Sequence, residues 1–207
     1  MTKLEKIDKL ETKARKRSAK RSRRKDELAL AAIDALKQLG YARTSLRDIA
    51  EISGVSVGML HYYFEDKTDL ITFCVRKYKA GFVADLEALL TGDIAPDALP
   101  RAFADGLCAS IRREAETHRL WYDIRAQALF DADFTDVVNE IEDSLLALVS
   151  RLFQRLGLSQ DGALAGYLAL DGGFRYHLQR HLSGDGAAID AFHRYIMAQF
   201  GGLNPQG

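Results

Sequence analysis

The feature that most constrains this chain is a pair of short helical segments, each opened by a serine and joined through a glycine. Ser45 and Ser56 are good N-caps, because a serine hydroxyl accepts a hydrogen bond from a free backbone N–H of the first turn. Gly54 permits the tight turn between them, where a side chain would be strained. The pattern predicts helices over 46–53 and about 57–64 that pack against each other.

A longer amphipathic segment precedes this pair and braces it. Its apolar residues recur at spacings of three and four, and Gly40 ends the run as a C-cap glycine would. These residues are Leu28, Ala32, Ile33, Leu36 and Leu39. Three such helices make a helix-turn-helix, whose second short helix fits the major groove of DNA. With Ile49, Ala50, Val55, Leu60 and Phe64 facing inward, the outward residues of that helix are Val57, Met59, His61 and Tyr62.

Charge is unevenly distributed along the 207 residues, although the net charge is zero. Residues 1–67 hold 16 Lys/Arg against 10 Asp/Glu, and residues 68–207 hold 13 against 19. Nine of the thirteen residues from Lys13 to Lys25 are basic. A basic end on an acidic body is expected of a polyanion-binding module. We expect residues 1–21 to form a disordered arm, which is either a solubilising tail or a segment that lies along DNA.

The remainder of the chain has helical periodicity and no strand-like alternation, which predicts an all-α fold. Asp66 caps a long helix from Lys67 toward Leu90. Five more helices are expected over about 97–115, 118–130, 134–156, 160–182 and 187–200. The predicted division is the arm 1–21, a three-helix DNA-binding domain 22–68, and a helical domain 69–207, to which the resemblance described below assigns ligand binding and dimerisation.

Several classes of protein are disfavoured by the residues the chain lacks. Cys74 and Cys108 are isolated, which gives no disulfide framework and no CxxC metal pair. No run of 18 apolar residues occurs, so we expect no membrane span, and a cytoplasmic location. Cys108 and His118 lie ten residues apart without a third orienting group, so we expect no catalytic site, no metal and no cofactor.

The helix-turn-helix region resembles the TetR family of bacterial regulators over about residues 24–72. The matching positions are Thr44-Ser45, Ile49-Ala50, the unbroken run Gly54–Phe64, Lys67 and Leu70. One position departs from the pattern, because many members have Tyr where this chain has His61. The resemblance implies DNA contacts from Thr44, Ser45, Arg47, Val57, Gly58, Met59, His61, Tyr62 and Lys67.

Residues 73–200 are similar, more loosely, to regulatory domains of this family, in particular the betaine-operon type. The resemblance rests on Arg119-Leu120-Trp121-Tyr122 and Leu170-Asp171-Gly172-Gly173-Phe174. It implies a homodimer in which the last two helices pair with their mates as a four-helix bundle. The apolar residues expected at that interface are Tyr167, Leu170, Phe174, Leu178, Phe192 and Ile196, and Ala163, Gly166, Gly172 and Gly173 would permit close approach.

A ligand pocket is expected among the same helices, lined by aromatic residues with a few polar groups. The candidates are Tyr78, Phe82, Phe103, Trp121, Tyr122, Arg125, Phe174 and His177, with Phe130 and Asp171 as further possibilities. For each residue alone, a place in the core or on a solvated surface is an equal alternative.

The leading functional hypothesis is a dimeric repressor that binds a palindromic operator and is released by a small-molecule effector of unknown identity. A second hypothesis is a sequence-tolerant architectural protein that binds double-stranded DNA through its basic arm. A third is a ligand-binding scaffold whose helix-turn-helix no longer binds DNA.

Overall fold

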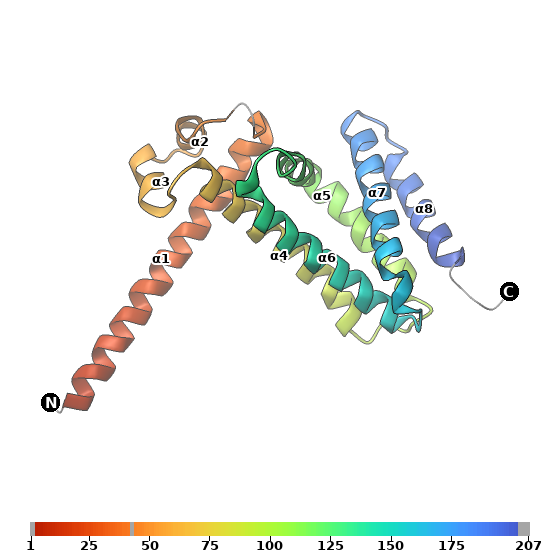
Figure 1. Cartoon of the computed structure of the whole chain (residues 1–207), viewed down its shortest axis with the longest axis horizontal. Helices are drawn as coiled ribbons and strands as arrows, with labels where there is room; N and C mark the ends of the chain where they lie inside the picture. Colours follow the sequence, from red (N-terminus) through yellow and green to blue (C-terminus); the bar gives the residue numbers. More distant parts are fainter. Residues whose placement is uncertain (1–2, 42–43, 203–207) are drawn as a thin grey trace. The chain divides into compact units, whose positions relative to one another are not determined.

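The structure is a computed structural model that describes residues 3–41 and 44–202. All regular secondary structure in those ranges is helical, which confirms the all-α prediction (Figure 1). The chain divides into two compact units, Met1–Cys74 and Val75–Gly207.

The first unit contains α1 (Lys3–Leu39), α2 (Leu46–Ile52), α3 (Val57–Tyr63) and the start of α4 (Lys67–Thr91). The predicted local signals are all present. Gly40 and Gly54 have positive φ values of 74° and 64°, which glycine adopts without strain. The side chains of Ser45 and Ser56 cap α2 and α3. The fully buried side chains at the centre of this unit include Leu28, Leu36, Ile49, Leu60, Phe64 and Leu70.

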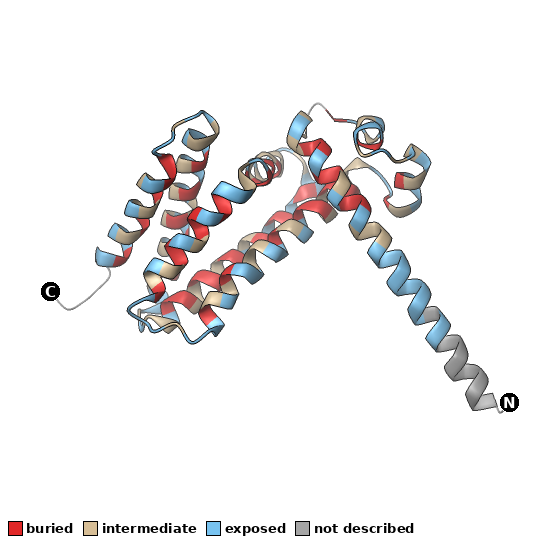
Figure 2. Cartoon of the chain, turned by 180° about the vertical axis from the view of Figure 1, so that it is seen from behind, coloured by how far each residue is buried: buried red, intermediate tan, exposed pale blue. Residues whose placement is uncertain are grey.

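Residues 3–21 are helical in the structure and form the first turns of α1, whereas we expected a disordered arm. Lys, Arg, Ala and Glu are good helix formers, and the helix continues directly from the packed segment that begins at Leu28. The described side chains between 12 and 23 are exposed, which Figure 2 shows as the pale blue part of this helix. Residues 3–21 are therefore helical because of their helix propensity and their continuity with the packed part of α1, and not because of tertiary packing.

The first unit also extends further than the predicted boundary at residue 68. Leu70, Ile71 and Cys74 are each fully buried, and the Cys74 thiol donates to the backbone oxygen of Ala29 at 3.3 Å. The division after Cys74 follows from this packing, because the first two turns of α4 complete the core of the first unit.

The second unit contains the rest of α4 together with four helices that pack around a shared core. They are α5 (Leu99–Gln127), α6 (Thr135–Arg155), α7 (Ala163–Leu182) and α8 (Ala188–Gly202), with 3₁₀ turns at Ala132–Phe134 and Gln160–Gly162. Helix α7 packs against α5, α6 and α8. Two glycines of α7 allow this, because a Cβ at Gly166 would collide with the ring of Phe153 and one at Gly173 with the ring of Tyr195.

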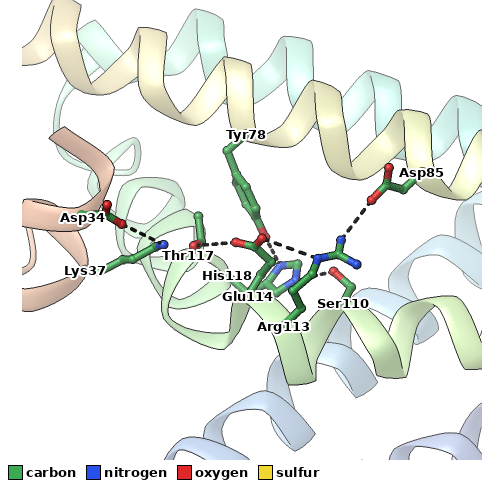
Figure 3. A network of polar contacts seen from close by, with 9 residues as sticks. All are labelled: Asp34, Lys37, Tyr78, Asp85, Ser110, Arg113, Glu114, Thr117 and His118. Atoms are coloured by element: carbon green, nitrogen blue, oxygen red, sulfur yellow. Dashed lines mark hydrogen bonds and ion pairs between the residues drawn. The ribbon is translucent and has the colours of Figure 1, made fainter. Parts of the chain in front are cut away.

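Helix α5 replaces the two helices that we predicted over 97–115 and 118–130. It is continuous but kinked at Glu114, whose φ and ψ are −133° and 24°. Ser110 and His118 lie on either side of the kink and are joined by a hydrogen bond of 2.7 Å between Oγ and Nε2 (Figure 3). The break that we predicted between residues 115 and 118 is thus a bend within one helix and not a loop.

His118 is fully buried and has a partner at each ring nitrogen. The Tyr78 hydroxyl lies 2.5 Å from Nδ1, opposite Ser110 on Nε2 (Figure 3). Burial lowers the pKa of His118 to about 2, and the charge of Lys79 adds to this effect. A neutral imidazole offers one donor and one acceptor, so this pair of partners satisfies it completely. The ring therefore fastens α4 to both arms of the kinked α5.

Candidate functional site

Helix α3 presents most of its surface to solvent. Leu60 is its one buried residue, and its N-cap Ser56 accepts a hydrogen bond from the backbone N–H of Met59 at 3.2 Å. Gly58, His61 and Tyr62 are exposed, and Tyr62 has 68% of its surface free. Val57 and Met59 are half-buried. Of the four residues predicted to face outward, His61 and Tyr62 are exposed, and Val57 and Met59 are partly covered.

The start of α2 forms a second exposed part of the first unit. Ser45 and Asp48 make a reciprocal capping box, in which the Ser45 backbone N–H donates to the Asp48 carboxylate at 2.7 Å. Hydrogen bonds from the Ser45 hydroxyl and backbone lower the pKa of that carboxyl. Ser45 and Arg47 are exposed, as a residue that contacts DNA must be.

Thr44 and Lys67 differ from the other expected DNA contacts, because both are engaged inside the domain. Thr44 is buried, and its hydroxyl donates to the backbone oxygen of Gly40. Lys67 donates to the backbone oxygen of Tyr41 at 2.7 Å, with its ammonium 4.1 Å from the centre of that ring. Thr44, just before α2, is thus bound to Gly40 after α1, and Lys67 at the start of α4 is bound to Tyr41. The motif alone does not reveal this structural role.

A basic hollow of about 830 Å³ lies between α1 and α3. Its lining consists of Arg17, Ser18, Lys20, Arg21, Arg23, Arg24, Glu27, Tyr62 and Tyr63. The guanidinium of Arg21 lies 5.7 Å from the centre of the Tyr62 ring, and Arg24 donates to the sulfur of Met59 at 3.3 Å. The basic segment of the sequence is thus joined to the exposed face of α3, which sequence reasoning did not establish.

The second unit contains a cavity of about 50 Å³. It is lined by Lys79, Phe82, Leu86, Phe103, Leu107, Tyr122, Leu145, Leu148, Val149, Tyr167, Leu170, Asp171 and Phe174. Of the expected pocket residues, Phe82, Phe103, Tyr122, Phe174 and Asp171 are present in this lining.

The other expected pocket residues lie elsewhere in the second unit. Tyr78 bonds His118, Trp121 is fully buried in the core, and Phe130 is 89% exposed beyond the end of α5. His177 packs between the rings of Phe192 and Tyr195. Aromatic residue type alone does not distinguish a cavity wall from solid core or surface, because these sites differ only in what packs beside them.

Arg125 lies beside the cavity wall and joins two carboxylates. It pairs with Glu142 at 2.7 Å and with Asp171 at 2.5 Å. Burial opposes its charge, but the hydrogen bond and the charge of Asp171 raise its pKa overall. The Tyr122 hydroxyl donates to Asp171 at 2.9 Å, and the Tyr167 hydroxyl donates to Glu142. Asp171 therefore has hydrogen-bond donors from two side chains, whereas Oε1 of Glu142 is paired with Arg125 by charge but accepts no hydrogen bond.

Lys79 is the one charged residue of the cavity lining that sequence reasoning missed. It is 4% exposed and lies among rings, 4.7 Å from the Phe82 ring centre and 4.8 Å from that of Trp121. The sequence contains a signal for the burial of this lysine. One face of α4 carries Val75, Lys79, Phe82 and Leu86, at spacings of four, three and four. A lysine within an apolar stripe predicts a buried amine.

The residues expected at the dimer interface are buried within the chain itself. Tyr167, Leu170, Phe174, Leu178, Phe192 and Ile196 are all 8% exposed or less. Gly166 and Gly173 likewise approach Phe153 and Tyr195 of the same chain. The exposed apolar side chains of α7 are instead Leu164, Leu168 and Tyr176, at 54%, 55% and 56%. Helix α7 is apolar on more than one face. The face that we expected at a dimer interface is packed in the core of the same chain.

Within the described residues, no helix has the length and apolar character to cross a membrane, and no cluster of side chains could hold a metal ion. Cys108 donates to the backbone oxygen of Ile189 and has no bond to His118.

Comparison with known proteins places the helix-turn-helix in a described family. Residues 28–72 match the model of the tetR family of bacterial regulatory proteins. The HTH-type transcriptional regulator BetI of Proteus mirabilis is 31% identical over 85 residues, which are 40% of this chain and 42% of that protein. RutR of Escherichia coli K12 is 38% identical over 81 residues, covering 39% and 38% of the two chains. The chain thus matches about two fifths of the length of these curated relatives.

Solved structures share the fold over a greater length. A TetR transcription regulator from Haloarcula marismortui superposes with a TM-score of 0.74 at 20% identity, covering 88% of this chain and 98% of that one. A transcriptional regulator from Rhodococcus superposes with a TM-score of 0.72 at 16% identity, covering 86% and 95%. Residues 28–72 are thus similar to the tetR family of bacterial regulatory proteins, and over most of its length the chain shares the all-helical fold of these solved structures.

Proposed function

We propose that the protein is a DNA-binding transcription regulator that inserts α3 into the major groove of an operator. The observation that carries this proposal is the exposed face of α3, which projects His61 and Tyr62 beside the basic hollow while Leu60 alone is buried. A helix N-terminus with exposed polar groups suits the major groove, and the flanking arginines suit the phosphates.

Gly58 supports a close approach of α3 to another molecule. A Cβ at this position would meet nothing within 4 Å, so packing inside the protein does not require a glycine there. A glycine within a helix costs up to about 1 kcal/mol relative to alanine. Close approach of the helix backbone to a base edge explains that cost.

We propose further that the protein acts as a homodimer paired through α7. Leu164, Leu168, Gly172 and Tyr176 follow one another at intervals of four residues and are all exposed, so they form one ridge along the helix. A dimer carries two recognition helices, which read two half-sites about one DNA turn apart. This pairing uses the opposite side of α7 from the one that the sequence indicated.

The cavity of the second unit is the proposed effector site, and the regulator is proposed to be a repressor. Helix α4 contributes Lys67 to the first unit and Lys79, Phe82 and Leu86 to the cavity wall. An effector releases DNA only if it binds the DNA-free conformation more tightly than the DNA-bound one. A cavity of about 50 Å³ is far smaller than a typical ligand pocket, so binding of a larger effector requires α4 or its neighbours to move.

The test of DNA binding is a mobility shift on the promoter region of the gene itself, with competitor DNA. Tyr62→Ala should weaken operator binding at least tenfold, because it removes the largest exposed side chain of α3. Phe130→Ala is the control, since this side chain is 89% exposed in the other unit. Equal binding by wild type and Tyr62→Ala would overturn the proposal and favour a scaffold that does not read DNA.

A second candidate function is sequence-tolerant DNA binding, which the basic hollow favours. Replacement of Arg17, Lys20 and Arg21 by Gln removes three of its charges. For an operator-specific regulator, this triple variant should bind all sequences more weakly, reduce the salt dependence, and keep the preference for the operator. For the architectural alternative, wild-type binding would show no sequence preference in the first place.

A further inference from the structure

Lys79 is a buried amine whose hydrogen-bonding capacity is unused. Its contacts are with the faces of aromatic rings, at 4.7 Å for Phe82, 4.8 Å for Trp121 and 5.8 Å for Tyr78. Within the described part of the chain, Nζ forms no hydrogen bond and no ion pair. Buried lysines are rare without a partner, because loss of water from the charged group is costly.

A second donor in the same neighbourhood is also unsatisfied. The Trp121 side chain is 1% exposed, and its Nε1–H has no acceptor among the described residues. The ring of this residue is the one that lies 4.8 Å from Nζ of Lys79. Two buried donors therefore lie close together where no acceptor is provided by the protein.

The acids near the cavity do not supply the missing acceptor. Asp171 is bound by Arg125 at 2.5 Å and Tyr122 at 2.9 Å, and Glu142 is bound by Arg125 and Tyr167. Neither carboxylate forms a hydrogen bond or an ion pair with Lys79, and the two acids act on its amine only through their charge at longer range. The rest of the lining is mainly aliphatic and aromatic, including Leu86, Phe103, Leu107 and Leu148.

We propose that the cavity binds a small organic acid, whose carboxylate accepts hydrogen bonds from Lys79 and whose apolar body packs against the aliphatic and aromatic wall. A hydrogen bond between an ammonium and a carboxylate is about twice as strong as a neutral one. The apolar body gains by leaving water, and a single anchored charge at one end fixes its orientation. This inference rests on the proposed function, since it names the class of effector for the same cavity.

A groove on the surface of the second unit shares Lys79 with the cavity. Lys79 also lines an outer groove of about 260 Å³ between α4 and α6, along which Arg76 pairs with Glu140 at 2.8 Å. Lys79 thus lines both the groove and the cavity.

The experiment uses calorimetric titration of the full-length protein, without DNA, at pH 6.5. The probes are butanoate, hexanoate and octanoate, with 1-hexanol and hexylamine matched in chain length to hexanoate. Lys79→Met keeps the length of the side chain and removes the amine, and Lys79→Gln keeps a neutral donor. Lys77→Met, which changes an exposed lysine on the same helix, is the matched control.

The proposal expects at least one of the acids to bind wild type and the Lys77→Met variant alike. It expects the affinity for that acid to fall about tenfold or more in Lys79→Met, with an intermediate loss in Lys79→Gln. Affinity for 1-hexanol should be equal in all four proteins. The proposal is overturned if no acid binds at millimolar concentration, if hexanoate and 1-hexanol bind equally, if hexylamine binds best, or if Lys79→Met retains full affinity for the acid.

Failure of the DNA proposal gives a different result. If an acid binds through Lys79 but operator DNA is not released, the ligand site stands and its role as an effector site fails. If Tyr62→Ala leaves operator binding unchanged, the DNA-binding proposal fails and the calorimetric result with Lys79→Met is unaffected.

Discussion

Helices α3 and α7 both combine apolar and exposed residues, yet the sequence predicted the outward face of one and not of the other. In α3 the predicted outward residues are exposed (His61 and Tyr62) or half-buried (Val57 and Met59), and Leu60 is the sole buried residue. In α7 the residues expected at a dimer interface, such as Tyr167 and Leu178, are buried against the same chain. A short helix with one apolar face can pack in one way only. A helix with two apolar faces can place either face against the core of its own chain.

The two units also differ in what they bury. The described core of the first unit is apolar except for Thr44, and its basic side chains lie outside. The second unit buries Lys79, Ser110, Thr117 and His118. Polar groups on the surface of the first unit are suited to a large polyanion, and polar groups inside the second are suited to a small enclosed ligand. The following predictions test this contrast, from the largest expected effect to the smallest.

Leu168→Glu tests which face of α7 is free. If the ridge with Leu164 and Tyr176 pairs two chains, a glutamate there should weaken dimerisation at least a hundredfold, because the charge would be buried against an apolar surface. Analytical ultracentrifugation measures the change. Phe130→Glu, which alters an equally exposed apolar residue off this helix, should have no effect. Retention of the dimer by Leu168→Glu would remove α7 from the proposed interface.

Gly173→Val tests the inner face of the same helix. A Cβ at this position collides with Tyr195, so we expect a loss of about 2–3 kcal/mol in the free energy of unfolding. The adjacent Gly172 has nothing within 4 Å of its Cβ position, and Gly172→Ala should keep or slightly raise the stability. Chemical denaturation of both variants gives the comparison. Equal stabilities would show that α7 does not pack on α8 as described.

Lys79→Met should stabilise the protein near neutral pH, by about 1–2 kcal/mol, because it replaces a buried charge with an apolar side chain of similar length. Burial lowers the pKa of Lys79 from 10.5 to about 7, with Asp171 and Glu142 opposing the shift and Arg125 adding to it. The unfolded chain therefore binds more protons than the folded chain between pH 7 and pH 10.5, so wild-type stability rises with pH across that window.

The advantage of the methionine variant should accordingly be largest below pH 7 and should shrink as pH rises toward 10.5. Thermal unfolding of the two proteins across this range measures it. A difference that is constant with pH would show that the amine is not buried in the folded state.

Gly58→Ala separates stability from DNA binding in the first unit. The added methyl group meets no protein atom within 4 Å, so stability should be unchanged or higher by up to about 1 kcal/mol. Operator affinity should fall about tenfold, because the methyl group would stand between α3 and the DNA. Denaturation and a mobility shift on the same preparation provide both values. Unchanged affinity would show that α3 does not approach DNA at this residue.

Much of the first unit could be predicted because its determinants are local. Ser45 and Ser56 set the starts of α2 and α3, and Gly40 and Gly54 set the turns, through bonds and backbone angles within a few residues. The engagement of Thr44 with Gly40 was not predicted, because the motif records residue type and not the partner.

In the second unit the sequence predicted where helices occur but not what they enclose. The kink at Glu114 is spanned by a hydrogen bond between Ser110 and His118, eight residues apart, and His118 is also held by Tyr78 from another helix. The cavity depends on how four helices fail to fill the space beside Lys79.

The sequence by itself determined the helical class, the helix-turn-helix and the basic charge near it, since propensity, capping and charge act within a few residues. Only the tertiary structure decided which side of α7 is buried, which aromatic residues line the cavity, and that an amine lies there without an acceptor. Those outcomes depend on the packing of side chains distant in sequence, where several arrangements satisfy the same apolar pattern and differ in the volume they fill.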